Sequence, residues 1–441
     1  MLASLRSRLS AWIGDASLKR LIKNSSMLFG AETIATLISL VQFPLVTRLL
    51  GPEEYGVWGI VVGWVGLVGQ IVSFRLWETV VKYVSEFAAQ GREDRVLAII
   101  KLCMLIEIIV GLVFTLTLGL SAEWTSRALL RRADGADLIR LETLHLMMSW
   151  GSGIWMPLLR VFDRFRRIAV FNTVSAFATF ALTLSALALR LGVAGMIVTM
   201  TIVALGQTMA LAMMAERELR KRFHRHWLTA DLGALRGRRR EILVMLFSMN
   251  IDALRKIAVG NADMVILGWL ATPAQVGVYR LAKQLSSFFG RLTNPVYDTL
   301  YPEVARLYPA EGPAAVRMLV KRLMKGLLVA LGFATAGAYA LSPWVVPLIF
   351  GAEYRPAIPV FFVILLTNIW VVGLWAPSVM VSAGHAKHLT VINTLASLSM
   401  IVALLVLAPP FGGMGAALSA VGFHLIWLAL VLPPARRLLR S

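Results

Sequence analysis

Hydrophobic runs of membrane-spanning length, separated by short polar segments, recur along the whole chain. None shows the ten-residue alternation typical of a membrane β-barrel. The pattern predicts an all-α integral membrane protein with about twelve transmembrane helices. These lie near residues 25–47, 57–80, 96–121, 143–162, 168–190, 193–215, 242–266, 276–300, 323–341, 358–383, 389–408 and 414–433.

The longest polar interval, residues 216–241, divides these spans six and six. We interpret it as a basic cytoplasmic linker between an N-terminal lobe at 25–215 and a C-terminal lobe at 242–441. Residues 1–24 carry leucines and cations at amphipathic spacing, so we expect a helix that lies in the cytoplasmic interface.

The two halves also resemble each other. GVWGIV (56–61) aligns with GVYRLA (277–282), and the offset stays near 220 residues elsewhere. Since six spans separate the halves, both share one topology, which is a parallel repeat. Such a repeat predicts a substrate site between the halves near the membrane midplane.

Composition and charge support the membrane class and indicate which side of the membrane the termini occupy. Hydrophobic residues make up 58% of the 441 residues, charged residues only 15%, and the net charge is +20. The cations concentrate in alternate loops and in both tails, which predicts that both termini are cytoplasmic. Because no basic patch lies on a soluble domain, we exclude nucleic-acid binding. A single cysteine excludes an internal disulfide, and we expect neither a metal site nor a cofactor.

Polar side chains occupy one face of the predicted helix 276–300. A cation at the centre of a bilayer helix costs roughly 2.5–3.5 kcal/mol, so this face should turn away from lipid. Either it lines a cavity for an anionic ligand, or its cations pair with acids on neighbouring helices. The three cations lack an acid one helical turn away, which favours the ligand. The face carries Arg280, Lys283, Gln284, Ser287, Arg291, Asn294 and Asp298.

The related spans at the head of each lobe hold further intramembrane polar residues. As additional candidates for substrate binding we name Gln42, Arg75, Arg255, Lys256 and Asn261. The acids Glu32, Asp252 and Asp263 are candidates for binding a coupling ion. Two alternatives stay open: Asp252 and Lys256 neutralise each other across one turn, and Glu32 is a protonated helix contact.

Four stretches carry a resemblance to a known family. They are RLLGPEEYGVWGI (48–60), VILGWLATPAQVGVYRLAKQL (265–285), YPEVARL (301–307) and VPLIFGAEYRPAIPVF (346–361). In order and spacing they resemble the Wzx-type polysaccharide-biosynthesis flippases of the multidrug/oligosaccharidyl-lipid/polysaccharide exporter superfamily. The resemblance implies two six-helix lobes in a V with a central cavity.

The resemblance also implies a function. Such proteins are thought to move polyprenyl-diphosphate-linked oligosaccharides across the bacterial inner membrane by alternating access, for O-antigen, capsule or exopolysaccharide. The implied partners are the lipid-linked glycan, membrane lipid and polysaccharide polymerases. Buried cations would attract the diphosphate.

Two other functions compete with this one. A cation-coupled multidrug or small-molecule exporter of the same superfamily would need an acidic cavity, which the cations of helix 276–300 disfavour. A membrane polymerase or ligase would need acceptor chemistry outside the membrane, and the longest outer loop, 122–142, is short and lacks histidine. We therefore expect a transporter and no enzyme.

Overall fold

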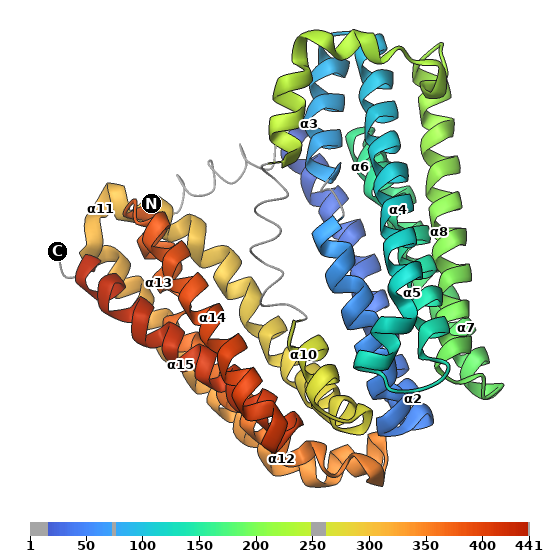
Figure 1. The fold of residues 1–441 in the computed structure, drawn as a ribbon. Coiled ribbons are helices and arrows are strands. Elements are labelled where there is room, and N and C mark those ends of the chain that lie inside the picture. The colour runs from blue at the N-terminus through green and yellow to red at the C-terminus, as the bar shows by residue number, and fades with distance from the viewer. Residues whose placement is uncertain (1–15, 73–75, 248–261, 440–441) are drawn as a thin grey trace. The chain divides into compact units, whose positions relative to one another are not determined.

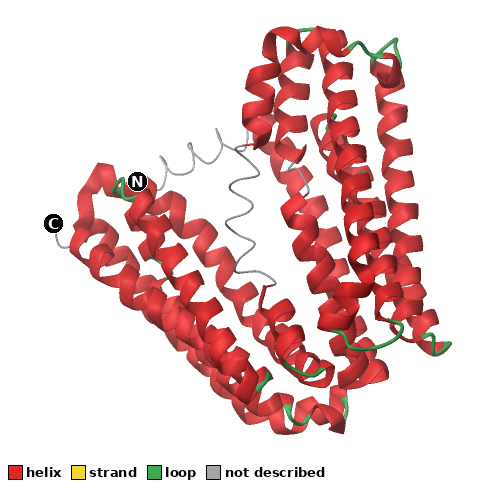
Figure 2. Cartoon of the chain, viewed as in Figure 1, coloured by secondary structure: helices red, strands yellow, loops and turns green. Residues whose placement is uncertain are grey.

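The computed structural model describes residues 16–72, 76–247 and 262–439, and these are helical almost throughout (Figure 1). No strand occurs in these ranges (Figure 2). Eight helical segments within them are long and apolar enough to cross a membrane. The predicted all-α membrane class is confirmed. Most of the predicted N-terminal amphipathic segment and of the seventh span lies outside the described residues.

Two long helices each contain two predicted spans, joined at a glycine. Helix α2 (Ala16–Val72) turns at Gly51 with φ 71°, and α11 (Pro273–Phe350) turns at Gly312 with φ 81°. Glycine adopts positive φ without the steric cost of a side chain, so it suits both turns. The third, fifth, sixth, eleventh and twelfth spans are α4 (Glu93–Leu129), α7 (Phe165–Ala188), α8 (Gly192–Arg222), α14 (Ala386–Phe411) and α15 (Gly413–Leu438).

Two other predicted spans are each broken into shorter helical segments. The fourth consists of α5 (Gly135–Trp150) and α6 (Ser152–Val161), which meet at Gly151. The tenth consists of α12 (Ala357–Leu365), the 3₁₀ segment η4 (Leu366–Gly373) and α13 (Ala376–Ser382). Two further helices are shorter: α3 (Leu76–Ala89) and α10 (Ala262–Leu270).

The chain forms two compact units. The first takes in residues 1–46, 65–126 and 133–257, and the second takes in 47–64, 127–132 and 258–441. In the first unit α8 packs against α5, α6 and α7. In the second unit α15 packs against α11, α12 and α14 (Figure 1). The lobe boundaries predicted from the sequence place segments 47–64 and 127–132 in the N-terminal lobe. In the structure these two segments pack with the second unit.

Two glycines that the internal repeat aligns hold residues 47–64 in the second unit. A Cβ on Gly56 would lie 1.8 Å from the carbonyl oxygen of Pro273. Reciprocally, a Cβ on Gly277 would lie 1.9 Å from the carbonyl oxygen of Pro52. Only a residue without a side chain lets the two backbones approach this closely. The repeat thus appears in space as a symmetric contact between equivalent positions.

The basic segment after α8 folds against the first unit. Its 3₁₀ segments are η1 (Trp227–Thr229) and η2 (Leu232–Arg238). The Trp227 ring lies edge-on to Trp155, with ring centroids 5.7 Å apart. Lys101 Nζ donates a hydrogen bond to the Ala230 carbonyl oxygen at 2.8 Å, and Leu235 is buried. The segment is therefore packed onto the first unit over this stretch.

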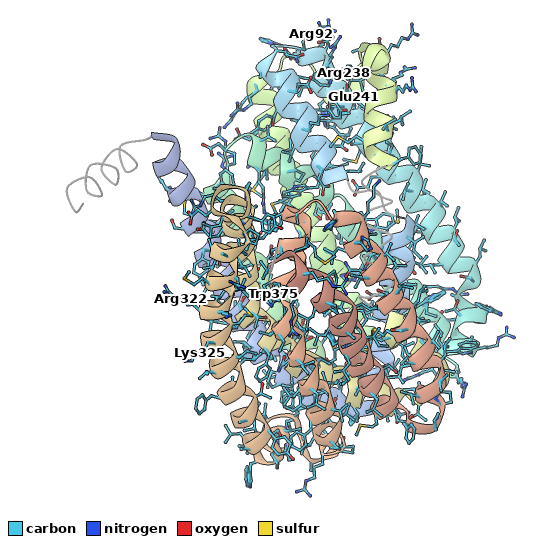
Figure 3. The ribbon with its side chains drawn as sticks, turned by 90° about the vertical axis from the view of Figure 1, so that its left-hand side faces the viewer. Arg92, Arg238, Glu241, Arg322, Lys325 and Trp375 are labelled. Carbon is cyan, nitrogen blue, oxygen red and sulfur yellow. The ribbon has the colours of Figure 1, made fainter. Side chains whose placement is uncertain are left out.

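Charged side chains tie the end of this segment to α3. Arg238 donates to Glu241 at 2.5 Å and to Glu86 at 2.8 Å, and Figure 3 shows Arg238 beside Glu241. Lys82 and Tyr83 each donate to Glu241 at 3.1 Å. Hydrogen bonds from Arg238, and next from Lys82, lower the pKa of Glu241 to about 2.

The contact between Gly56 and Gly277 predicts a steric effect of Gly277→Ala. The added Cβ meets backbone, which cannot move aside as a flexible side chain can, so we expect a loss of roughly 1–3 kcal/mol or more in unfolding free energy. Gly326→Ala is the control on the same helix, because a Cβ there has nothing within 4 Å. Unfolding in detergent measures both variants, and equal stabilities would contradict this role of the contact.

The lowered pKa of Glu241 predicts a pH dependence of stability. Because the folded-state pKa lies below the ordinary value of 4.5, the stabilisation is complete above that value and is lost as the pH falls toward 2. The melting temperature of the wild type should therefore fall more steeply than that of Glu241→Gln between about pH 5 and pH 3. The difference should be small, since the partners are half exposed to solvent. Parallel melting curves would argue against a role for this cluster.

Candidate functional site

Asp263, in the first turn of α10, is a buried acid with three hydrogen-bond donors. Its Oδ1 accepts the backbone N–H of Met264 at 2.9 Å. Its Oδ2 accepts the Tyr279 hydroxyl at 2.7 Å and the Lys283 ammonium at 2.6 Å. The start of a helix favours a carboxylate, and the ammonium neutralises it. The acid is therefore fully satisfied although it is only 2% exposed.

The start of α11 determines which residues reach this acid. Thr272 caps the helix: its hydroxyl accepts the N–H of Gln275, and the Gln275 side chain accepts the N–H of Thr272. This capping box fixes the helical register from its first turn. Tyr279 and Lys283, four residues apart, then share the face that points toward α10.

The ion pair of Lys283 and Asp263 is asymmetric in its exposure. The carboxylate side chain is 1% exposed, whereas the Lys283 side chain is 35% exposed. Lys283 borders a cavity of about 290 Å³ within the second unit. The positive end of the pair is thus the end that a ligand in this cavity would meet. The polar lining comprises Asp263, Tyr279, Lys283, Ser286, Ser287, Thr367, Asn368 and His424, and the apolar lining includes Trp370, Met400 and Phe423.

The break in the tenth span supplies two of the polar groups. The 3₁₀ segment η4 carries Thr367 and Asn368, and the Asn368 amide donates to Thr335 Oγ1 at 3.3 Å. A 3₁₀ stretch inside a helix often marks a functional position. From α15, His424 Nδ1 lies 2.7 Å from the Ala420 carbonyl oxygen, so Nδ1 carries the proton and the ring is held in place.

The lining offers a ligand three kinds of contact. Hydroxyl, amide and imidazole groups bind a ligand rich in hydroxyls, and the Trp370 and Phe423 rings offer flat apolar surface. The ammonium of Lys283 attracts one anionic group. Within the described residues no cluster of acids, histidines or cysteines is placed to hold a metal ion.

Arg280 does not line this cavity. Its guanidinium lies 4.4 Å from the Tyr55 ring centroid and 4.2 Å from that of Trp58. It also donates to the Tyr55 carbonyl oxygen at 3.1 Å. Gly59 makes room for this arrangement, since a Cβ there would lie 2.8 Å from Arg280 Cδ. Two aromatic faces and a backbone acceptor thus stabilise the cation away from lipid.

Helical spacing left two alternatives open for the cations of this face. Lys283, which has no acid one turn away on its own helix, has an acidic partner in Asp263. The partner sits on the preceding helix, where spacing within one helix cannot reveal it. Lys283 therefore has both expected features: it pairs with an acid, Asp263, and it borders a cavity.

The other predicted site residues fall in different places. Gln42 donates to Thr183 Oγ1 at 3.2 Å, a contact between α2 and α7 in the first unit. Glu32 is exposed on α2, and Gln284 is half-buried on α11. Arg291 lies on α11, but its side chain is not described. Outside the described residues lie Arg75, Asp252, Arg255, Lys256 and Asn261.

Sequence reasoning missed the contributions of Thr367, Asn368 and His424. Each stands within an otherwise apolar span. A threonine–asparagine pair in the middle of a hydrophobic run was the available signal of the break, and His424 was a lone titratable residue in the last span. Neither signal indicates by itself that η4 and α15 meet Lys283.

Comparisons with known proteins agree with this architecture. A family model described as "Polysaccharide biosynthesis protein" matches residues 21–308. The "Inner membrane protein YghQ" of Escherichia coli (strain K12) is 23% identical over 349 residues, which cover 78% of this chain and 97% of that protein.

Solved structures show the same fold at low sequence identity. An inward-facing multidrug resistance MATE family transporter of the MOP superfamily aligns with a TM-score of 0.71 and 12% identity, covering 92% of this chain and 94% of its own. The lipid II flippase MurJ, in an inward closed conformation, aligns with a TM-score of 0.69 and 13% identity, covering 94% and 87%. The chain therefore has the two-lobe fold of this superfamily.

A double-mutant cycle on Asp263 and Lys283 tests whether the pair is coupled. Removing one partner leaves the other charge uncompensated in a buried setting. The stability losses of Asp263→Asn and Lys283→Met, added together, should therefore exceed the loss measured for the double variant. We expect a coupling energy of about 0.5–3 kcal/mol from unfolding in detergent. The control cycle uses the exposed pair Glu303 and Arg306, where solvent screening should make the coupling weaker. Additive effects at Asp263 and Lys283 would refute the coupling.

Proposed function

The chain belongs to the polysaccharide biosynthesis protein family, and from this premise we propose that it moves a lipid-linked oligosaccharide across the bacterial inner membrane. Its substrate class is a polyprenyl-diphosphate-linked glycan for a cell-surface polysaccharide. The fold shared with the lipid II flippase MurJ and the name of the inner-membrane relative support the proposal.

The cavity beside Lys283 is the observation that carries this proposal. A diphosphate is anionic, and the exposed end of the ion pair with Asp263 is the cationic end. A glycan presents hydroxyls and ring faces, which match Asn368, His424 and Trp370 in the lining. The lipid tail needs no polar partner and remains in the hydrocarbon.

The pair also suggests how binding and release alternate. An incoming diphosphate competes with the Asp263 carboxylate for the ammonium of Lys283. When the glycan leaves, the ion pair between Lys283 and Asp263 forms again. The site would open to one side of the membrane at a time, by alternating access, with both termini cytoplasmic. Coupling to an ion through Asp263, Glu32 or Asp252 remains a prediction, as do substrate contacts by Arg280 and the other cations.

The exposed charge favours this function over the alternatives. A multidrug exporter for cationic compounds would expose the acid of the pair to the ligand, whereas here Lys283 is the more exposed member of the pair. A polymerase or ligase is disfavoured because the fold is shared with transporters and a flippase. Polymerases of the same pathway are proposed as partners.

Lys283→Gln tests the proposal. Native mass spectrometry of the wild type purified from a polysaccharide-producing bacterium should show a retained polyprenyl-diphosphate glycan, and the variant should retain it roughly tenfold or more weakly, as expected for loss of a charged hydrogen bond. In proteoliposomes, Lys283→Gln should flip a synthetic polyprenyl-diphosphate disaccharide more slowly than the wild type by the same factor.

Arg322→Gln is the matched control, because Arg322 is an exposed cation on the same helix (Figure 3). It should retain and move the glycan as the wild type does. Equal retention and flipping by Lys283→Gln and the wild type would exclude this site. Co-purification of phospholipid alone, together with no flipping by the wild type, would exclude the function.

A further inference from the structure

The first unit contains a second cavity, of about 240 Å³, that borders the carboxyl group of Glu107 on α4. The lining is mostly apolar, and its other oxygen-bearing side chains are two serines. The cavity sits at the break between α5 and α6. The lining comprises Leu76, Ile106, Glu107, Val110, Ser149, Trp150, Ser152 and Gly153.

The Glu107 carboxyl is without a hydrogen-bond donor on one side. Its Oε2 is buried and has no hydrogen-bond partner among the described residues. Burying an ionised carboxylate in apolar surroundings is costly unless a cation or donors compensate. Among the described residues the cavity lining supplies no cationic side chain. A proton bound to the carboxyl removes this cost.

The groups around Glu107 are acceptors. The hydroxyl of Ser149 donates its hydrogen to the Leu146 carbonyl oxygen, and that of Ser152 donates to the Ser149 carbonyl oxygen, both at 2.7 Å. Each hydroxyl has one hydrogen, so both serine oxygens can only accept a further bond. An ionised carboxylate also only accepts, whereas a protonated one donates. Protonation of Glu107 provides a donor beside these two serine acceptors.

The helix break adds a third acceptor. Pro157 has no N–H, so it cannot donate to the carbonyl of Gly153 one turn before it in α6. Gly153 lies beside the carboxyl: a Cβ on it would be 3.6 Å from Glu107 Oε1. The proline thus leaves the Gly153 carbonyl oxygen without its α-helical donor, on a residue that lies next to the Glu107 carboxyl.

We propose that Glu107 is a proton-binding site of the first unit. The carboxylate takes one proton from water, forming one O–H bond, and gives it back when the cavity is hydrated from the other side. This goes beyond the proposed function, since the site can be detected without any glycan.

Other titratable groups stand on the helices packed around this cavity, but none lines it. They include Lys101 and Cys103 on α4, Glu78 on α3, Glu142 and His145 on α5, and Arg160 on α6. Lys101 donates to Ala230, His145 contacts Glu142, and Arg160 stacks over Trp77.

Labelling with N,N′-dicyclohexylcarbodiimide tests the proposal, because this apolar reagent reacts with protonated carboxyl groups. In wild-type protein in nanodiscs, peptide mapping should find Glu107 modified at neutral pH, with labelling lost as the pH rises. Asp263 is the internal control: its Oδ2 is occupied by the Tyr279 hydroxyl and the Lys283 ammonium, so it should be labelled less than Glu107. Sodium ions should leave the labelling unchanged.

Infrared spectroscopy provides the second measurement. The wild type should show the carbonyl band of a protonated acid at neutral pH; Glu107→Gln should lose it, and Glu32→Gln, at an exposed position, should keep it. Unlabelled Glu107, protection by sodium, or an unchanged band in Glu107→Gln would overturn the proposal. Neither readout involves the glycan, so failure here is distinct from failure of the proposed function.

Discussion

A charge inside a bilayer must find a partner, and this requirement governs the polar groups described above. In the second unit a buried carboxylate is satisfied by Lys283, Tyr279 and a backbone N–H. Arg280 meets the same requirement differently, with two aromatic faces and a carbonyl oxygen. Glu107 is the contrasting case, an acid with one buried oxygen that has no hydrogen-bond partner among the described residues.

Both cavities lie where a membrane-spanning helix is interrupted. In the first unit the break falls at Gly151, beside Glu107, and in the second it is the 3₁₀ segment η4, beside Lys283. An interrupted helix leaves backbone groups without partners, and such groups are tolerated at membrane depth only against protein or a wet cavity. Helix breaks and polar cavities therefore occur together for one physical reason.

The two cavities differ in the sign of the charge that they present. The second unit exposes an ammonium whose counterion is almost fully buried, which suits an anionic lipid-linked ligand. The first unit presents a single carboxyl among acceptors, which suits a proton. A transporter that exchanges a glycan lipid against protons would need one site of each kind, and we propose that the two units divide these roles.

The sequence by itself determined the helical class, the positions of most spans and the internal repeat, because apolar runs of bilayer length have few alternative structures. It also pointed to Lys283 through the periodicity of one helix. Only the tertiary structure decided that Lys283 pairs with Asp263, that Asn368 and His424 share its cavity, and that Gly56 meets Gly277. Periodicity reports which side chains share a face of one helix, whereas partners on other helices depend on packing across many residues of sequence.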